Sequence, residues 1–318
     1  MGQKINITFL GTGSAIPTLK RNHPAILLQY KDENILIDCG EGTQRQFRKA
    51  KLNPLKLTRI LITHWHADHV LGLPGLIQTL MLNNYNKTLK IYGPAGTEKM
   101  MQLYLRLFAH REKIKIEVHE IDGKNFLKEE STKKEQASET IIDTDEFYIQ
   151  AKPMKHDVPT LAYSFIVKEK NRIDKEKFAK LKIPNSPLIA ELVKGKTITI
   201  GDRKISPKGL LYKEPERKIT IIMDTLPNPN TIKIAKNSDL LICESTYSDE
   251  EKECAKEHSH LTASEAAQIA KKSGSKRLIL THLSQRYETD QQQEKILQQA
   301  KQIFEETEIA KDFLKIEI

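Results

Sequence analysis

Three imidazoles and one carboxylate lie within six residues of this chain, inside the stretch 63–69. The apolar run directly before them predicts a buried strand, which would deliver these side chains to a loop. Residues two apart point the same way in an extended chain but lie about 200° apart around a helix. His64 and His66 can therefore share one cation only if this segment is not helical. Asp68 and His69 lie beyond a turn and can reach a second cation.

The donor types in this stretch indicate which ion it could hold. Imidazole combined with carboxylate suits zinc, and the same ligand types admit manganese or iron. Two simpler interpretations are a polar loop with scattered histidines and a structural zinc site. A structural zinc site usually uses cysteine and closes all four ligand positions, and no cysteine lies in this stretch. The residues therefore favour a catalytic metal centre.

The H-x-H-x-D-H motif at 64–69 resembles the metal signature of the metallo-β-lactamase superfamily of hydrolases. Because that superfamily is catalytically diverse, the motif implies a fold and a dinuclear centre and leaves the substrate open. A second stretch, Asp-Cys-Gly-Glu-Gly-Thr-Gln at 38–44, is similar to a segment of the ribonuclease Z family, the tRNA 3′-processing endonucleases within that superfamily. Asp38 ends a strand beside the metal loop, a position typical of a side chain that holds a ligating imidazole.

Three further candidates for metal ligation each accompany a predicted strand. His156 lies beside a strand, where a single histidine is usually structural, but its surroundings match the ribonuclease Z pattern and make it a ligand candidate. Asp224 ends an apolar strand, and a carboxylate there can bridge two cations with one oxygen to each. His282 directly follows another apolar strand, just as His64 follows the strand before the first motif, so it is also a candidate metal ligand.

His260 lies just ahead of a helix that we expect to begin with a capping box of Thr262 and Glu265 and to end at Gly274. The N-terminus of a helix favours anions. The residues alone predict a surface histidine at 260. The resemblance to the ribonuclease Z family implies that His260 corresponds to the family's histidine that does not bind metal and that protonates or stabilises the leaving oxygen. His258 does not match that histidine.

The resemblance implies a dinuclear centre with two zinc ions per chain, for which manganese could substitute. The family's ligands correspond to His64, His66 and His156 for one zinc, to Asp68, His69 and His282 for the other, and to Asp224 for the bridge. Asp68 would also orient the attacking water or accept its proton, and His260 would act as the general acid. The expected products are tRNA with a free 3′ hydroxyl and a trailer with a 5′ phosphate.

Both strands and helices must position these residues. Strands that alternate with helices, with ligands at strand ends, fit two sheets packed face to face and covered by helices. The resemblance supplies the specific architecture, a four-layer αββα metallo-β-lactamase sandwich that forms a single domain over 1–318 with a protruding basic arm. Apolar periodicity predicts helices over 71–84, 95–108 and 290–304, and a last strand over 313–318.

The segment 168–208 is strongly basic, with ten Lys and two Arg against five acidic residues. One interpretation is a solvated, Lys-rich surface segment. In the ribonuclease Z family, an arm at this place protrudes from the core and clamps tRNA, so the resemblance implies precursor tRNA as the partner. Residues 122–146 are charged and weakly periodic, which predicts an elaborated hairpin or a mobile loop. Arg286 could hold a phosphate or be a surface arginine.

Composition limits the classes of partner and compartment. The 318 residues carry a net charge of +9, with a sequence pI near 9.2, and this favours an anionic partner such as nucleic acid or a membrane surface. No apolar run of 18 residues and no signal-peptide core occur, so we expect a cytoplasmic protein that does not enter a membrane. The three cysteines form no close-spaced pair, which argues against a disulfide framework. The resemblance implies a homodimer in which the arm of one subunit serves the other subunit's site.

Two other functions fit parts of the sequence. A thioester hydrolase of the glyoxalase type shares the histidine motif, but it has no use for the basic arm or for the segment 40–44. A non-catalytic RNA-binding module would keep the basic surface, but it has no need to fill every ligand position, as this chain does. We therefore expect a zinc-dependent endoribonuclease that removes the 3′ trailer from precursor tRNA.

Overall fold

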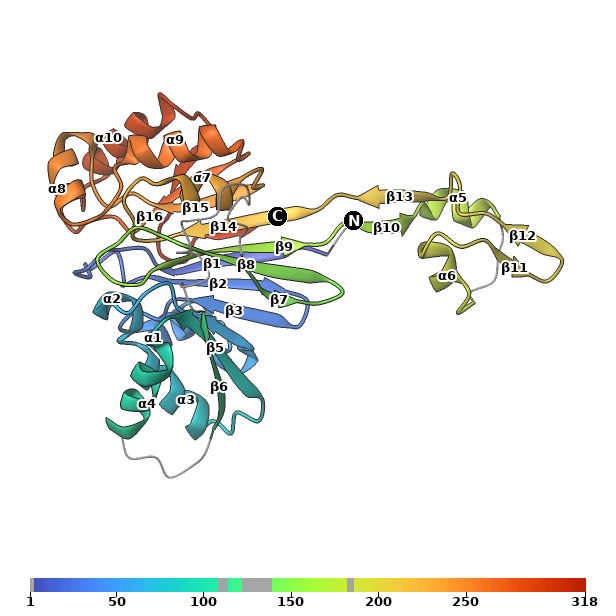
Figure 1. The fold of residues 1–318 in the computed structure, drawn as a ribbon, viewed down its shortest axis with the longest axis horizontal. Helices are drawn as coiled ribbons and strands as arrows, with labels where there is room; N and C mark the ends of the chain where they lie inside the picture. The colour runs from blue at the N-terminus through green and yellow to red at the C-terminus, as the bar shows by residue number, and fades with distance from the viewer. Residues whose placement is uncertain (1–2, 108–113, 122–138, 182–185) are drawn as a thin grey trace, which may run out of the picture.

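Two seven-stranded sheets pack face to face, and helices cover both outer faces (Figure 1). The computed structural model describes residues 3–107, 114–121, 139–181 and 186–318. Apolar side chains from the inner faces of both sheets meet in one continuous core. This arrangement confirms the predicted four-layer αββα architecture.

The first sheet combines the N-terminal strands with the last strand of the chain. Its strands are β1 (Ile5–Gly11), β2 (Ala25–Tyr30), β3 (Glu33–Ile37), β4 (Arg59–Leu61), β5 (Thr88–Pro94), β6 (Lys115–Ile121) and β18 (Lys315–Glu317). They lie in the order β18-β1-β2-β3-β4-β5-β6. β1 pairs antiparallel with both β2 and β18, whereas β3 to β6 pair in parallel. Alternation along β1 directs Ile5, Ile7 and Phe9 into the core between the sheets.

The second sheet places the remaining strands in the order β17-β16-β15-β14-β9-β8-β7. These strands are β7 (Glu139–Asp143), β8 (Phe147–Pro153), β9 (Leu161–Val167), β14 (Arg217–Ile222), β15 (Leu240–Glu244), β16 (Leu278–Thr281) and β17 (Thr307–Ile309). β14 to β17 run parallel to one another. The carboxyl ends of neighbouring parallel strands lie at the same edge of a sheet, so the residues that follow β14, β15 and β16 are brought together there.

Helices bury an apolar stripe against each outer face. The first sheet is covered by α1 (Thr43–Lys49), α3 (Leu73–Leu82) and α4 (Thr97–Leu107), and the second by α7 (Pro229–Ala235), α9 (Ala263–Ser273) and α10 (Asp290–Lys301). The periodicity predictions are confirmed for α3, α4 and α10, and for the last strand. The capping box of α9 and its left-handed cap at Gly274 are also as predicted. No periodic signal predicts α1, which is only seven residues long.

A projection leaves the second sheet between β9 and β14 and extends far from the core (Figure 1). Its stalk is the antiparallel pair β10 (Lys170–Ile173) and β13 (Leu211–Glu214). Its head contains α5 (Lys175–Lys180), α6 (Ile189–Val193), β11 (Ile198–Ile200) and β12 (Arg203–Ile205). Leu192, Ile198 and Ile205 form a small separate core in the head. The return strand β13 extends to Glu214, beyond the predicted arm boundary at 208.

Part of one predicted segment has no described structure. Of the residues 122–146, only 139–146 are described, and they begin with β7; residues 122–138 lie outside the described residues. Among the helices that the structure describes, none is both long enough and apolar enough to cross a membrane.

Candidate metal centre and active site

The loop after β4 has the conformation that its histidine spacing requires. His64 lies outside any helix, and His66, in extended backbone with φ −72° and ψ 151°, directly precedes the short helix α2 (Ala67–Val70). Asp68 and His69 belong to α2 and are buried. The chain therefore changes direction between the two pairs, as predicted.

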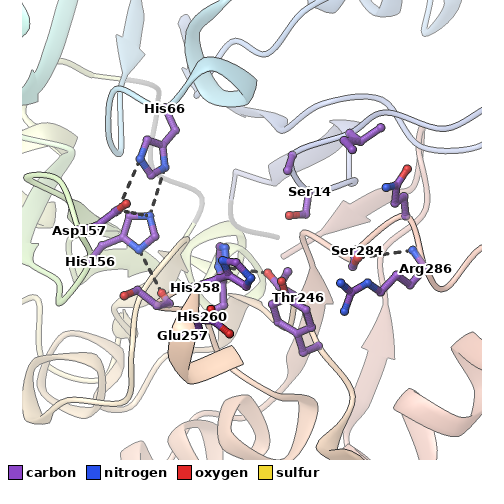
Figure 2. A pocket seen from close by; sticks show the side chains of 15 residues that line it. Ser14, His66, His156, Asp157, Thr246, Glu257, His258, His260, Ser284 and Arg286 are labelled. Atoms are coloured by element: carbon purple, nitrogen blue, oxygen red, sulfur yellow. Dashed lines mark hydrogen bonds and ion pairs between the residues drawn. The ribbon is translucent and has the colours of Figure 1, made fainter. Parts of the chain in front are cut away.

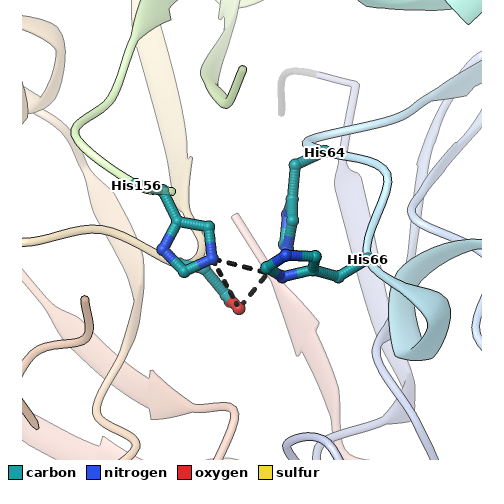
Figure 3. Close-up of side chains that lie close together, drawn as sticks. His64, His66 and His156 are labelled. Atoms are coloured by element: carbon teal, nitrogen blue, oxygen red, sulfur yellow. Dashed lines mark hydrogen bonds and ion pairs between the residues drawn. The ribbon is translucent and has the colours of Figure 1, made fainter. Parts of the chain in front are cut away.

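The first donor group contains His64, His66, His156 and Asp224, whose ligand atoms all lie within 4.8 Å of one another. Figure 3 shows the three imidazoles converging from the loop after β4 and from the loop after β8. His156 Nε2 lies 3.2 Å from His66 Nδ1, and His64 Nε2 lies 3.5 Å from Asp224 Oδ2. The structure thus brings together residues from distant parts of the sequence.

The second donor group contains Asp68, His69 and His282. His69 Nε2 and His282 Nε2 lie 3.2 Å apart, and Asp68 Oδ2 is 3.4 Å from each. The other oxygen of Asp224, Oδ1, lies 3.5 Å from His69 Nε2 and 3.3 Å from His282 Nε2. The Asp224 carboxylate therefore lies between the two groups, with one oxygen toward each.

The proton arrangement in the second group leaves lone pairs facing each other. His69 donates from Nδ1 to Asp38 Oδ2 at 2.7 Å, so the neutral ring carries a lone pair on Nε2. His282 Nδ1 contacts Thr246 Oγ1 at 2.9 Å, which leaves its Nε2 facing His69. Burial lowers the pKa of His69, but the carboxylates of Asp224, Asp38 and Asp68 raise it well above the usual range. The space between the two Nε2 atoms, which lie 3.2 Å apart, therefore favours a positive charge, either a proton or a cation.

Two buried polar atoms support the same conclusion. Among the described residues, His64 Nε2 and Asp224 Oδ1 have no hydrogen-bond partner although both are buried, and such groups are costly unless something binds them. Burial opposes ionisation of Asp224, but the surrounding imidazoles hold the pKa of its carboxyl well below the usual range. An anionic carboxylate among nitrogen lone pairs fits a divalent cation on each side.

Asp38 positions one of these imidazoles, as the sequence predicted. Besides accepting from His69, it accepts from the Thr63 backbone N–H at 2.7 Å and from the Thr63 hydroxyl at 2.8 Å. Asp38 lies directly after β3 and adopts a left-handed φ of 57°. Its carboxylate thus fixes both the ring of His69 and the start of the metal loop.

His260 lies ahead of α9 and next to both donor groups. Its Nδ1 bonds to Glu244 Oε1 at 3.1 Å and lies 3.9 Å from Asp224 Oδ2. Burial lowers the pKa of His260, but the carboxylates of Glu244 and Asp224 outweigh this effect and raise it to about 9. His260 also forms a third close donor group with Asp224 and His282.

Glu244 is a functional residue that was not predicted from the sequence. Its carboxylate is fully buried at the end of β15 and accepts from the Thr225 backbone N–H at 2.8 Å and from the Thr246 hydroxyl at 2.7 Å. Burial raises the pKa of Glu244, but the facing His260 lowers it by more, so the net pKa is below the usual value and the carboxylate stays ionised. A signal was available, since an acid follows an apolar strand at this point just as Asp224 follows β14.

A cavity of about 420 Å³ opens beside the donor groups. Figure 2 shows His66, His156 and His260 on its walls, with Ser14 and Arg286 across from His66. Arg286 is held by Glu251 at 2.7 Å and lies over the ring of Tyr247. The structure therefore places this arginine at the cavity, and His258 lines it as well.

A loop over 12–22 forms one rim of the cavity and is fixed by a distant carboxylate. Asp312, between β17 and β18, accepts from the Thr12 hydroxyl at 2.8 Å, from the Asn22 N–H at 2.9 Å and from the Gln46 amide at 2.9 Å. Within the loop, the Ala15 N–H donates to Asp68 Oδ2 at 2.9 Å. The rim is thus tied to the metal loop.

The chain resembles known proteins along its whole length. Residues 5–174 match the family model described as anti-Pycsar protein Apyc1. Ribonuclease Z of Methanothermobacter thermautotrophicus is 38% identical over 316 residues, which cover 99% of this chain and 97% of the relative. The crystal structure of human tRNase Z, short form, superposes with a TM-score of 0.70 at 29% identity and covers 98% of both chains. The metallo-β-lactamase fold protein YhfI of Bacillus subtilis gives a TM-score of 0.68 at 19% identity, over 100% of both chains.

The fold and the converging donor groups define a protein of the metallo-β-lactamase superfamily. The family model covers residues 5–174, which include the donors from His64 to His156 but not Asp224 or His282. The alignment with the ribonuclease Z of Methanothermobacter thermautotrophicus covers 99% of the chain and so includes all the donors. The chain belongs to the ribonuclease Z family, and residues 5–174 belong also to the family of that model.

Proposed function

We propose that this protein is an endoribonuclease that cuts the 3′ trailer from precursor tRNA, and that it acts with bound metal. The observation that carries the proposal is the pair of donor groups joined by Asp224, beside a cavity that His66 and His156 line, in a chain similar to ribonuclease Z from end to end. A glyoxalase-type hydrolase or a non-catalytic RNA-binding module is not favoured, because neither accounts for this full-length similarity.

We assign two zinc ions to each chain, with manganese as a substitute. His64, His66 and His156 would hold one ion, Asp68, His69 and His282 the other, and Asp224 would bridge them. Ions in these positions would lower the pKa of a water molecule and offset the negative charge that develops at the phosphorus. The two Nε2 atoms that face each other among carboxylates and the buried unpartnered atoms described above support this assignment.

The chain's own residues then bind and orient the reactants. Asp68 is fixed by the Ala15 N–H and can accept a proton from the attacking water. His260 is held by Glu244 through Nδ1, so its Nε2 remains available to protonate the departing 3′ oxygen of the tRNA. Arg286 provides a cation at the cavity for a phosphate of the substrate.

The experiment that tests the proposal is end-mapping of a 3′-extended precursor tRNA incubated with the zinc-loaded protein. We expect a single cut next to the discriminator base, and no cut with Asp68→Ala. Retained cleavage by that variant would contradict the role of Asp68. If no cut occurred in zinc or manganese, with the metals shown to be bound, the protein would have to act on a different ester substrate.

We assign the projection a role in binding tRNA, as a phosphate-contacting arm set apart from the site. The resemblance further supports a homodimer in which each arm serves the partner's site, and a cytoplasmic location, where precursor tRNA would be encountered. Shape recognition of RNA through phosphates and 2′ hydroxyls needs a basic surface at a fixed distance from the catalyst. The separate small core of the head supports such a rigid, remote contact.

Removal of the arm should weaken precursor binding and spare the chemistry. Ile173 and Leu211 are directly opposite in the stalk, so a Gly-Asn turn can replace residues 174–210 without straining the remaining ladder. We expect a higher KM for precursor tRNA and a flatter dependence of KM on salt, with unchanged hydrolysis of bis(4-nitrophenyl) phosphate. Unchanged precursor affinity would contradict the proposed role of the arm.

A further inference from the structure

Five exposed cations form a second basic surface, away from the arm. They lie on α1, on the turn after it and on the 3₁₀ helix η1 (Pro54–Lys56). No acidic residue occurs in the sequence between Glu41 and Asp68. We call this surface the α1 patch, and it consists of Arg45, Arg48, Lys49, Lys51 and Lys56.

Among the described residues, no cation of the α1 patch has an acidic partner, whereas some of the arm's cations have one. In the arm, Lys170 pairs with Glu146, Arg172 with Glu214, and both Lys194 and Lys196 with Glu191. Within the described part of the chain, no carboxylate lies within 4.0 Å of a side-chain nitrogen of the α1 patch. The α1 patch therefore presents positive charge that the protein does not neutralise.

The α1 patch also borders a groove of about 310 Å³. Arg48 and Lys51 line this groove together with polar and apolar side chains, which are Gln44, Asn53, Thr79, Asn83, Leu52, Pro54 and Leu55. The only aromatic residue between Gly42 and Thr58 is Phe47, which is fully buried. Protein-binding surfaces are enriched in accessible aromatic anchors, whereas cations and amides around a shallow groove suit a sugar–phosphate backbone.

Rigid backbone contacts connect the α1 patch to the metal loop. The Cys39 N–H donates to the His69 carbonyl at 2.8 Å, and the Gly72 N–H donates to the Cys39 carbonyl at 2.9 Å. A Cβ on Gly40 would lie 2.4 Å from the Asp68 carbonyl oxygen, so only glycine fits between the start of α1 and the metal loop. The start of α1 is therefore fixed relative to the donor groups. The rest of the α1 patch follows along the outer face of the first sheet toward the start of β4.

We propose that the α1 patch binds the phosphate backbone of the precursor RNA, as a contact separate from the arm. This inference rests on the proposed function. The contact would hold one part of the RNA on the outer face of the first sheet, whereas the arm would hold another part of the same RNA. Because phosphate contacts carry no base information, the α1 patch would raise affinity for precursors of any sequence.

The test uses the full chain with all five residues of the α1 patch changed to glutamine. A control variant removes the same charge from five exposed lysines elsewhere, by glutamine at Lys236, Lys271, Lys272, Lys311 and Lys315. KM and kcat for precursor tRNA would be measured over a salt series, with bis(4-nitrophenyl) phosphate as the small substrate. We expect the KM of the patch variant to rise about tenfold or more, and the salt slope to fall by about 0.7–0.9 for each phosphate that the variant no longer neutralises.

The outcomes separate this inference from the proposed function. Hydrolysis of the small substrate and the melting temperature should stay unchanged, which shows that fold and catalyst are intact. Equal effects in the control variant, or an unchanged salt slope in the patch variant, would overturn the inference and leave an acidic protein as the alternative partner. Failure of the native protein to cut the precursor would instead contradict the proposed function, and a gel-shift measurement with the same RNA would still compare the two variants.

Discussion

Replacement of Asp224 by asparagine should lower precursor cleavage by about 10³-fold or more and should deplete both cations. Asp224 directs one carboxylate oxygen to each donor group and is only 2% exposed, so the amide removes a charge that both groups share. Charge stabilisation by metal is worth several kcal/mol, and each 1.36 kcal/mol corresponds to a factor of ten in rate. The measurement is metal content by mass spectrometry after gel filtration, together with end-mapping of the products.

Asp157 provides the matched control for this prediction. Its carboxylate lies 3.0 Å from His156 Nε2, but its side chain is 63% exposed and it contacts only the first donor group. We expect Asp157→Asn to retain both cations and most of the activity. If Asp224→Asn kept two cations per chain, or if the two variants lost metal equally, the bridging role of Asp224 would be wrong.

His260→Ala should lower kcat for precursor tRNA by about 10²–10⁴-fold, which is the usual contribution of a general acid. The leaving 3′ oxygen of ribose is strongly basic and needs a proton, whereas 4-nitrophenolate leaves readily without one. Hydrolysis of bis(4-nitrophenyl) phosphate should therefore be nearly unchanged in the same variant. Metal content should also be unchanged, because the Nδ1 of His260 is bonded to Glu244.

Two variants near His260 separate proton transfer from other roles. Glu244→Gln keeps the shape of the side chain but weakens its hydrogen bond to His260. We expect a smaller loss of kcat, about 10–100-fold, that again affects precursor tRNA and spares bis(4-nitrophenyl) phosphate. His258→Ala changes another histidine of the cavity wall and should have little effect. An equal loss on both substrates in His260→Ala, or a loss of metal, would show that His260 binds a cation or stabilises the site in another way.

The metal loop was predictable from the sequence because its geometry is local. The spacing of His64 and His66 demands extended backbone, and the turn into α2 follows from where Asp68 and His69 must point. Asp38 was predictable for the same reason, since it ends a strand next to that loop. Capping residues set the limits of α9 in a similarly local way.

Other features depend on which strands become neighbours, and no local pattern specifies this. Glu244 acts on His260 because β15 lies between β14 and β16. His156 and Asp224 were assigned from the family resemblance, and their distance from His64 depends on how the two sheets are packed. The short helix α1 has no periodic signal because its seven residues bury only one large apolar side chain, Phe47, beside the polar Thr43 and Gln46.

The pairing of β18 with β1 determines when a newly made chain can mature. During translation, β1 has an unpaired edge until residues 315–317 emerge, and Asp312 reaches the Thr12 hydroxyl only across 300 residues of chain. At roughly 5–20 residues per second, synthesis leaves that edge open for about 15–60 s, and open edges invite association with other strands. The rim of the cavity can therefore be completed only after Asp312 has been made, so this wall of the site forms later than the strands that it borders.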